Sequence, residues 1–273
     1  MFRCPVPACR APLIEADDRR TWRCPSGHVH DVAREGYVNL LVTHQRRARE
    51  PGDSAEMLRH RRAFLEAGHY GVLRDAVRAA AGDLRPEVAV LDAGCGEGYY
   101  TRDWPVTLRG VDIARPAVRL AAKRARPDAD ARYAVASVYD LPVVDGSVDL
   151  VVSIFAPLHS PEFERVVRNG GRVLTVTPGP DHLAGLKARL FAEPEAHPAT
   201  GPFEREGATT GLVAEGTERV RAHLHLTDAG DVDHLLHMTP YAWYVAPEVR
   251  AGVVSEGPLS TPIDFLVSAY RRT

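Results

Sequence analysis

The chain has 273 residues, of which 45% are hydrophobic, so it is long enough to bury one large core and to carry a second, smaller domain. Its formal net charge of −2 argues against a generally basic surface for nucleic acid, although residues 1–71 hold 12 arginines against 9 acidic residues. No apolar segment approaches the roughly eighteen residues of a membrane span, and the N-terminus lacks a signal-peptide core. We therefore expect a cytoplasmic protein.

Three of the four cysteines lie in the first 24 residues, where Cys4 and Cys9 are followed by Cys24 and His28. Two turn-forming ligand pairs joined by a short linker are typical of a zinc ribbon, in which each pair gives two ligands to a tetrahedral ion. His30 is an alternative to His28, and the first pair encloses four residues instead of the more common two. Three cysteines cannot all pair as disulfides, so the sequence predicts a structural zinc site.

The linker between the two ligand pairs, residues 13–23, is expected to form a short hairpin. Basic side chains are densest after the zinc site, as Arg46, Arg47, Arg49, Arg59, Arg61 and Arg62, with His44 and His60 among them. Because acidic residues are interspersed, this cluster is either a solvated helix face or a surface that contacts phosphate.

Asp53 and Glu56 have capping-box spacing and start a predicted helix that ends at Gly68, and a second helix is expected at residues 72–81.

The segment LDAGCGEGYYT, residues 91–101, follows the apolar residues 88–90. An apolar run that ends at an acidic residue and continues into alternate glycines predicts a buried strand, a tight loop and then a helix. Gly94, Gly96 and Gly98 permit positive φ and close approach of the backbone to a ligand. Their spacing departs from the dinucleotide fingerprint and resembles the glycine loop of class I methyltransferases, although a plain turn remains an alternative.

Polar residues follow the first three predicted strands. Asp92 can order the glycine loop through its amides, and Asp112, followed by Ile113, lies about twenty residues later at the end of the second strand. A carboxylate there can accept hydrogen bonds from both ribose hydroxyls. Ser137 and Val138 follow the third strand, where similar methyltransferases contact adenine. Together these features make S-adenosylmethionine the expected cofactor.

Strands and helices alternate through the middle of the chain. Strands are expected at residues 131–135, 150–154 and 172–177, and helices directly after Tyr99 and at residues 115–124, 161–168 and 181–190. This alternation is typical of an α/β fold with a doubly wound parallel sheet, which binds its ligands at the carboxyl ends of the strands.

The last third of the chain lacks the regular alternation of strands and helices seen in the middle of the chain. Residues 191–216 show no clear period and predict a loop or a mobile lid over the target base. Residues 219–226 and 263–270 alternate well enough to predict a final antiparallel pair of strands, with a helix at residues 228–237 between them.

Six motifs occur in the chain as HVHDVAREGYVNLL (28–41), EPGDSAEMLRHRRAFLEAGHY (50–70), LDAGCGEGYYT (91–101), IFAP (154–157), TPGPDHL (177–183) and MTPYAW (238–243). Together, and in this order, they resemble the RlmA family of 23S ribosomal RNA (guanine-N1)-methyltransferases, which includes macrolide-resistance enzymes. The likeness covers nearly the whole chain.

The resemblance implies a zinc-binding domain at residues 1–45, a helical linker with the basic cluster at residues 46–82, and a class I, Rossmann-like methyltransferase domain at residues 83–273. It also implies that Tyr70, Gly96, Glu97 and His182 lie around S-adenosylmethionine. The implied substrate is a hairpin of large-subunit ribosomal RNA, and a homodimer is expected because members of the family are often dimeric.

Methylation of guanine N1 requires loss of the proton on N1, so the reaction needs an aligned methyl donor and a proton acceptor of suitable pKa. The candidate acceptors are His159 and Asp181, with His182 and His237 as further candidates. Extrusion of the base would bring it to aromatic residues, and Phe155, Tyr241 and Trp243 either stack on it or pack in the core.

Two other functions remain open from the sequence. The overall acidity and the segment Leu158–Ser160 allow a small-molecule methyltransferase or a cofactor-repurposing biosynthetic relative. A non-catalytic RNA-binding or ribosome-assembly factor that keeps the fold is the other alternative.

Overall fold

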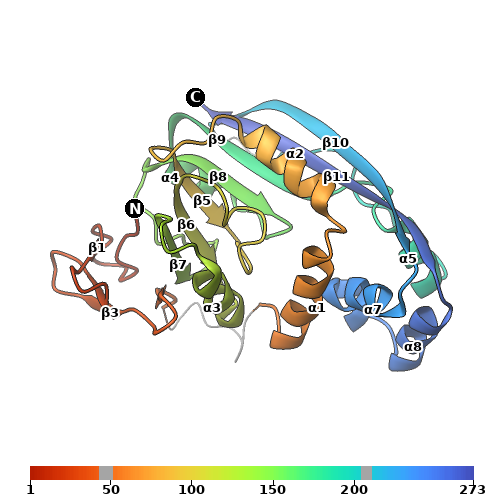
Figure 1. The fold of residues 1–273 in the computed structure, drawn as a ribbon. Helices are drawn as coiled ribbons and strands as arrows, with labels where there is room; N and C mark the ends of the chain where they lie inside the picture. Colours follow the sequence, from red (N-terminus) through yellow and green to blue (C-terminus); the bar gives the residue numbers. More distant parts are fainter. Residues whose placement is uncertain (43–51, 204–210) are drawn as a thin grey trace.

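The computed structural model describes residues 1–42, 52–203 and 211–273 (Figure 1). In the predicted basic cluster, His44, Arg46, Arg47 and Arg49 therefore lie outside the described residues. The β structure forms a small three-stranded sheet near the N-terminus and an eight-stranded sheet. Among the described residues, no helix combines the length and the apolar character that a membrane crossing needs.

The small sheet has the order β1-β2-β3, with β1 (Ile14–Glu15), β2 (Thr21–Arg23) and β3 (Val29–Asp31) all antiparallel. Ile14 pairs with Arg23, so the predicted hairpin at residues 13–23 is confirmed. Strands of two or three residues bury little apolar surface, so this sheet needs other contacts to stay folded.

The large sheet has the order β10-β11-β9-β8-β5-β6-β7-β4. Its strands are β4 (Tyr37–Asn39), β5 (Ala89–Ala93), β6 (Thr107–Asp112), β7 (Ala131–Val135), β8 (Val148–Ile154), β9 (Val167–Pro178), β10 (Leu212–Leu226) and β11 (Leu259–Arg272). The strands from β4 to β9 pair in parallel, which confirms the doubly wound sheet. The strand order reverses between β5 and β8, and such a switch point is where this fold forms a ligand crevice.

The predicted final pair of strands is also confirmed, since β10 and β11 are antiparallel and β11 pairs with β9. Both strands are longer than predicted. Figure 1 shows the β10–β11 ribbon curving past the parallel strands toward α5 and α8, at the end of the molecule away from β1 and β3.

The helices are α1 (Ala55–Glu66), α2 (Gly71–Ala81), α3 (Arg115–Arg124), α4 (Ser160–Val166), α5 (Ala184–Leu190), α7 (Ala229–Met238), the 3₁₀ helix η2 (Pro240–Trp243) and α8 (Pro247–Ser255). The helix predicted after Tyr99 is wrong, because residues 99–103 form only turns. Pro105 disfavours helical backbone at the residue before it. The Thr101 side chain is directed inward, where its hydroxyl donates a hydrogen bond to the Asp92 carboxyl group. Helix α8 was not predicted.

The start of α1 also differs from the prediction. Ser54 is the N-cap residue, and its side chain accepts a hydrogen bond from the backbone N–H of Met57 at 3.2 Å. Asp53 lies one residue before the cap and forms an ion pair with Arg61. The capping-box assignment of Asp53 is therefore wrong, because a serine at the next position provides the cap.

Two apolar clusters cover the two faces of the large sheet. One contains buried residues of α1, α2, α3, α5 and α7, such as Leu73 and Val118. The other contains Phe163 of α4 together with Phe2, Leu13 and Trp22 of the N-terminal segment. The N-terminal segment thus adds its apolar side chains to the face that α4 covers.

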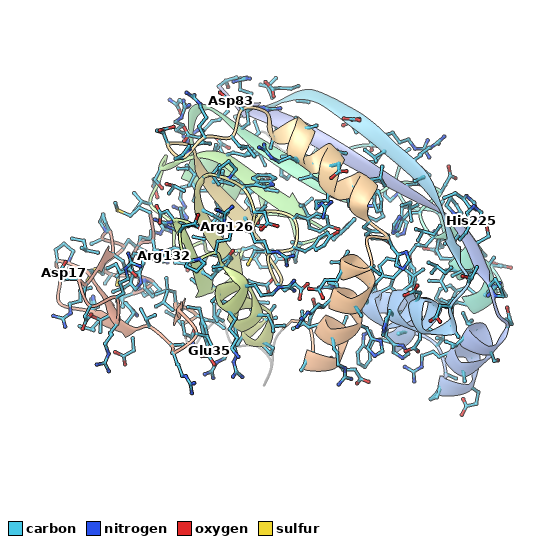
Figure 2. The ribbon with its side chains drawn as sticks, viewed as in Figure 1. Asp17, Glu35, Asp83, Arg126, Arg132 and His225 are labelled. Carbon is cyan, nitrogen blue, oxygen red and sulfur yellow. The ribbon has the colours of Figure 1, made fainter. Side chains whose placement is uncertain are left out.

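Polar contacts join the same N-terminal segment to the loop between β7 and β8. Arg10 donates two hydrogen bonds to the Asp140 carboxylate, at 2.8 and 3.0 Å, and Arg3 pairs with Asp145. Arg132, labelled in Figure 2, extends from β7 to Glu15 of β1. Within the segment predicted as the zinc-binding domain, residues 37–39 form β4, which pairs with β7 of the large sheet. The boundary at residue 45 stays a prediction.

Candidate functional site

The four predicted metal ligands, Cys4, Cys9, Cys24 and His28, lie together, with their ligand atoms all within 4.8 Å of one another. The Sγ atoms of Cys9 and Cys24 are 3.6 Å apart, and His28 Nδ1 lies 3.6 Å from Cys4 Sγ and 3.3 Å from Cys24 Sγ. Ligands of a tetrahedral zinc ion with Zn–S bonds of about 2.3 Å are separated by about 3.8 Å or slightly less. The donor set and its spacing therefore fit a structural zinc ion.

Local backbone hydrogen bonds form the two knuckles. The Cys9 N–H donates to the carbonyl of Val6, and the Cys24 N–H donates to the carbonyl of His28. The four residues enclosed by the first pair thus fold into a tight turn and do not spread the ligands apart. His30 Nε2 approaches Cys4 Sγ only to 3.9 Å and lies outside the four-ligand group, so the geometry favours His28 over His30.

A cavity of about 590 Å³ opens at the carboxyl ends of β5, β6, β7 and β8. It falls in the size range of small-molecule sites, about 300–1,000 Å³. It brings together nearly all of the predicted cofactor residues, namely Tyr70, Asp92, Gly94, Gly96, Glu97, Asp112, Ile113, Ser137, Val138 and His182. Gly98 does not line the cavity.

The three glycines of the loop after β5 all have positive φ, of +81°, +53° and +77°. A Cβ atom on Gly94 would lie 2.2 Å from that of Ala156, so this glycine permits close packing against the loop after β8. A Cβ atom on Gly96 would meet no protein atom within 4 Å. The backbone at Gly96 therefore faces open space where a ligand can approach it.

Two carboxyl groups, the half-buried Asp112 and the buried Asp92, organise the floor of the cavity. Asp112 accepts hydrogen bonds from the backbone N–H groups of Gly96 and Ala114, at 2.9 and 2.7 Å. These bonds join the ends of β5 and β6 and use one lone pair on each oxygen, so both oxygens can still accept from ligand hydroxyls. Asp92 accepts a hydrogen bond from Thr101, and burial raises the pKa of Asp92 to about 7.

Glu97 is a third carboxyl group at the cavity, and it is buried, with 2% of its surface exposed. Neither of its oxygens has a hydrogen-bond partner among the described residues, and the nearest cation is the Arg124 guanidinium at 3.4 Å. Burial raises the pKa of Glu97. A buried carboxyl without a hydrogen bond normally has a ligand or water as its partner.

Tyr70 and His182 contact each other across the cavity wall, with Tyr70 Oη 3.4 Å from His182 Nε2. The backbone N–H of Asp264 donates to His182 Nδ1, so the proton of the neutral ring is on Nε2. Burial lowers the pKa of His182 to about 3. His182 is thus held neutral with its only acceptor nitrogen in use, which excludes it as the proton acceptor.

The other candidate proton acceptors do not reach the cavity. Asp181 is bound to the guanidinium groups of Arg219 and Arg221, at 2.8 and 3.3 Å. His159 is the residue before α4 and contacts the ring of Tyr139, which itself lines the cavity. His237 is paired with Asp233 on α7. The structure therefore gives none of these three direct access to a ligand in the cavity.

Several cavity residues were missed by the sequence analysis. The Asp53–Arg61 ion pair lines the cavity beside Met238, the last residue of α7. His197 was also not predicted, and it shares a hydrogen bond of 3.0 Å with Tyr241, one of the predicted stacking residues. His197 lies in a segment without periodic pattern, and Arg61 is one arginine in a run of basic residues, so no local pattern marks either of them.

Phe155 stands out among the aromatic residues of the cavity. It follows β8, its φ of +53° is in the left-handed region, and 44% of its surface is exposed. A bulky residue in this conformation is uncommon and is found most often at functional sites. Its ring lies 6.4 Å from that of His182, on the cavity side of the sheet.

Comparisons with known proteins give matches for both parts of the chain. A family model described as "RlmA, N-terminal", a zinc ribbon, matches residues 2–49, and a model described as "Methyltransferase domain" matches residues 91–177. The first contains all four ligands of the zinc cluster. The second contains the carboxyl ends of β5, β6, β7 and β8, where the cavity opens.

Curated relatives match over nearly the full length. A putative 23S rRNA (guanine-N(1)-)-methyltransferase of Micromonospora griseorubida is 38% identical, covering 99% of this chain and 97% of the relative. The 23S rRNA (guanine(748)-N(1))-methyltransferase of Streptomyces fradiae is also 38% identical, covering 94% and 91%. Among solved structures, a putative methyltransferase of Bacillus halodurans matches with a TM-score of 0.50 at 15% identity, over 73% of this chain and 98% of that one. The structural match concerns the fold alone.

Proposed function

Because the chain belongs to the family of 23S ribosomal RNA (guanine-N1)-methyltransferases, we propose that it transfers a methyl group from S-adenosylmethionine to N1 of a guanine in large-subunit ribosomal RNA. One observation carries this proposal. A zinc ribbon and a nucleoside-sized cavity occur in one chain, and they are joined through the loop that also carries the cavity residues Ser137 and Val138. A methyltransferase that acts on small molecules has no evident need for a zinc ribbon.

S-adenosylmethionine supplies an electrophilic methyl group that needs no metal for its transfer. Asp112 is suited to accept hydrogen bonds from the ribose hydroxyls, since its oxygens are fixed by Gly96 and Ala114 and retain free lone pairs. Ser137 and Val138 would border the adenine. Glu97, with no hydrogen bond of its own, offers a buried acceptor to a charged or hydroxyl group of the cofactor.

The target guanine must leave its stack to reach this cavity, because N1 lies on the Watson–Crick edge. Phe155 presents an exposed ring at the cavity and is the best-placed residue to stack on the base. Trp243 and Tyr244, which are 61% and 78% exposed, follow Tyr241 and extend the aromatic surface outward. Stacking on aromatic rings is how proteins hold unpaired RNA bases.

His197 is the group that we assign as acceptor of the N1 proton. It lines the cavity, and burial lowers its pKa below the ordinary value, so the ring is neutral near pH 7 and can accept a proton. Tyr241 Oη, 3.0 Å away, holds the orientation of the ring. The ring also lies 6.2 Å from that of His182, and the Phe155 ring lies 6.4 Å from the same His182 ring.

The zinc ribbon is the part that we expect to hold the RNA hairpin. Arg19, Arg20, Arg23 and Arg34 are exposed there and form no ion pair with another described residue. Phosphate contacts from such arginines bind RNA without reading its sequence. Base selection would then depend on the hairpin shape and on the cavity.

The test is methyl transfer to RNA. The full chain is incubated with S-adenosylmethionine carrying a labelled methyl group and with 23S ribosomal RNA that lacks the modification. We expect label in the RNA and, because a methyl on N1 blocks Watson–Crick pairing, a reverse-transcription stop next to a single guanine. Tight cofactor binding without label in RNA would instead favour a small-molecule substrate.

A further inference from the structure

Imidazole and carboxylate groups from α1 and α7 converge where the two helices pack, outside the cofactor cavity. His60 lies on α1, and Asp233 and His234 lie on α7. The Nδ1 atoms of His60 and His234 are 3.0 Å apart, and His60 Nδ1 is 3.5 Å from Asp233 Oδ2. All three ligand atoms lie within 4.8 Å of one another.

These distances match those between neighbouring ligands of one metal ion. Two nitrogen or oxygen ligands at about 2.0–2.1 Å from a tetrahedral zinc ion are about 3.3 Å apart. Two imidazole nitrogens and one carboxylate oxygen form a donor set that suits zinc and related transition metals, whereas magnesium and calcium prefer oxygen ligands. Three protein ligands would leave a fourth position for water.

A neighbouring histidine holds the carboxylate in place. His237 Nδ1 lies 3.0 Å from Oδ1 of Asp233, the oxygen that is not directed at His60. Metal-binding carboxylates are normally held in this way by a second hydrogen bond. The ligands are half-buried, with 13% of the His60 side chain exposed, and Asp233 also borders a groove of about 740 Å³.

We propose that His60, Asp233 and His234 bind a divalent transition-metal ion, represented here by Zn²⁺, which cross-links α1 to α7. The two helices continue directly into the cavity wall. Arg61 and Leu65 of α1 line the cavity, and so do residues 238–241 at and after the end of α7. Figure 1 shows the two helices side by side, at the other end of the molecule from β1 and β3. The bound ion therefore fixes the mouth of the cavity from outside, and it is a second metal site separate from the ribbon.

The first experiment counts zinc ions. The full chain, freed of metal and kept reduced, is titrated with Zn²⁺ alone, and we expect two equivalents to bind, the second more weakly. His60→Ala and His234→Ala should each bind one. His69→Ala is the matched control, because His69 forms a comparable pair with Asp231 of α7 at 3.1 Å but lies outside the cluster, and it should still bind two. One equivalent in the wild type, or two in His60→Ala, would overturn the proposal.

A second experiment identifies the ligands of each ion from the spectrum of the wild type. Co²⁺ replaces Zn²⁺ in the wild type and is added one equivalent at a time. The equivalent bound at the ribbon should give a thiolate-to-metal absorption band, and the other should give only the weaker visible bands of a nitrogen and oxygen site. Zn²⁺ should also raise the melting temperature of the wild type after the ribbon is filled, and not that of His60→Gln. A thiolate band from both equivalents would contradict a separate histidine site.

Discussion

The zinc ribbon and the cofactor cavity are stabilised in different ways. The ribbon has three strands of two or three residues, and its ligands converge on one point. The cavity is formed by the ends of strands in an eight-stranded sheet with apolar clusters on both faces. The ribbon therefore needs its metal to fold, whereas the floor of the cavity is held in place by the core of the large sheet.

This difference predicts a division of tasks between the two regions. A part that folds only with a bound ion can present arginines to RNA without touching the cofactor. A part held by a large core can keep carboxyl groups buried, as at Asp92 and Glu97, where water would otherwise solvate them. The contact between Arg10 and Asp140 joins the two parts. Substitutions in one region should therefore leave the task of the other largely intact.

The largest effect is expected from loss of a zinc ligand. Cys24→Ala should lower the rate of RNA methylation by at least about 100-fold, because structural zinc supplies most of the folding free energy of such a ribbon. The affinity for S-adenosylmethionine, measured by calorimetry, should change by less than about threefold, since the cavity does not include the ribbon. His30→Ala is the control and should keep the thiolate-to-metal band of the Co²⁺ protein. Equal loss of cofactor binding in Cys24→Ala would break the division between the regions.

The reciprocal change is Asp112→Ala in the cavity. It removes the acceptor of two ligand hydroxyls and frees the N–H groups of Gly96 and Ala114, so the affinity for S-adenosylmethionine should fall by about 100-fold or more. Calorimetry gives the affinity, and the Co²⁺ spectrum of the ribbon should stay unchanged. Asp128→Ala, a substitution of an exposed aspartate, is the control. Unchanged cofactor affinity would disprove the ribose assignment.

A smaller and more selective effect is expected at the rim. His197→Ala should lower kcat for RNA methylation by about 100-fold while leaving the KM for S-adenosylmethionine nearly unchanged, because a proton acceptor contributes to the rate and not to cofactor binding. The remaining rate should rise with pH as the guanine itself loses its N1 proton. His159→Ala, outside the cavity, should have a normal rate. A raised KM with normal kcat would make His197 a binding residue.

The sequence predicted best what depends on residues close together in the chain. Cys24 and His28 are four positions apart, and Gly94, Gly96 and Gly98 form one loop, so short-range spacing reveals both. The strands of the parallel sheet other than β4 were found because their apolar runs are nearly continuous. The carboxyl ends of such strands meet at one edge, which is why Asp92, Asp112 and Ser137 were correctly expected to lie together.

What escaped prediction depends on contacts between distant segments. His60 and His234 are separated by 174 positions, and nothing near either residue indicates the other. The predicted proton acceptors His159 and Asp181 do not line the cavity, because closeness along the chain to the end of a strand does not fix where a side chain points. Asp181 follows β9 but is bound by Arg219 and Arg221 of β10, and that strand approaches it only in the folded sheet.

The smallest effect concerns the stability of the folded protein. It tests whether burial of a carboxyl group at the cavity lowers the free energy of unfolding, an effect that the ribbon lacks. Burial first, and Asp112 as a lesser cause, raise the pKa of Asp92 to about 7 from the ordinary value of 3.8, so the folded protein holds this proton where the unfolded chain has lost it. The stability due to the neutral carboxyl is complete below pH 3.8 and is lost as the pH rises to about 7.

The substitution Asp92→Asn removes this pH dependence and keeps an acceptor for the Thr101 hydroxyl. Between pH 5 and pH 8 without cofactor, the free energy of unfolding of the wild type should therefore fall by about 2–3 kcal/mol relative to Asp92→Asn, a shift of several degrees in melting temperature. If the free energies of unfolding of the two proteins change with pH in the same way, Asp92 is ionised in the folded state, and a cation or water compensates its burial.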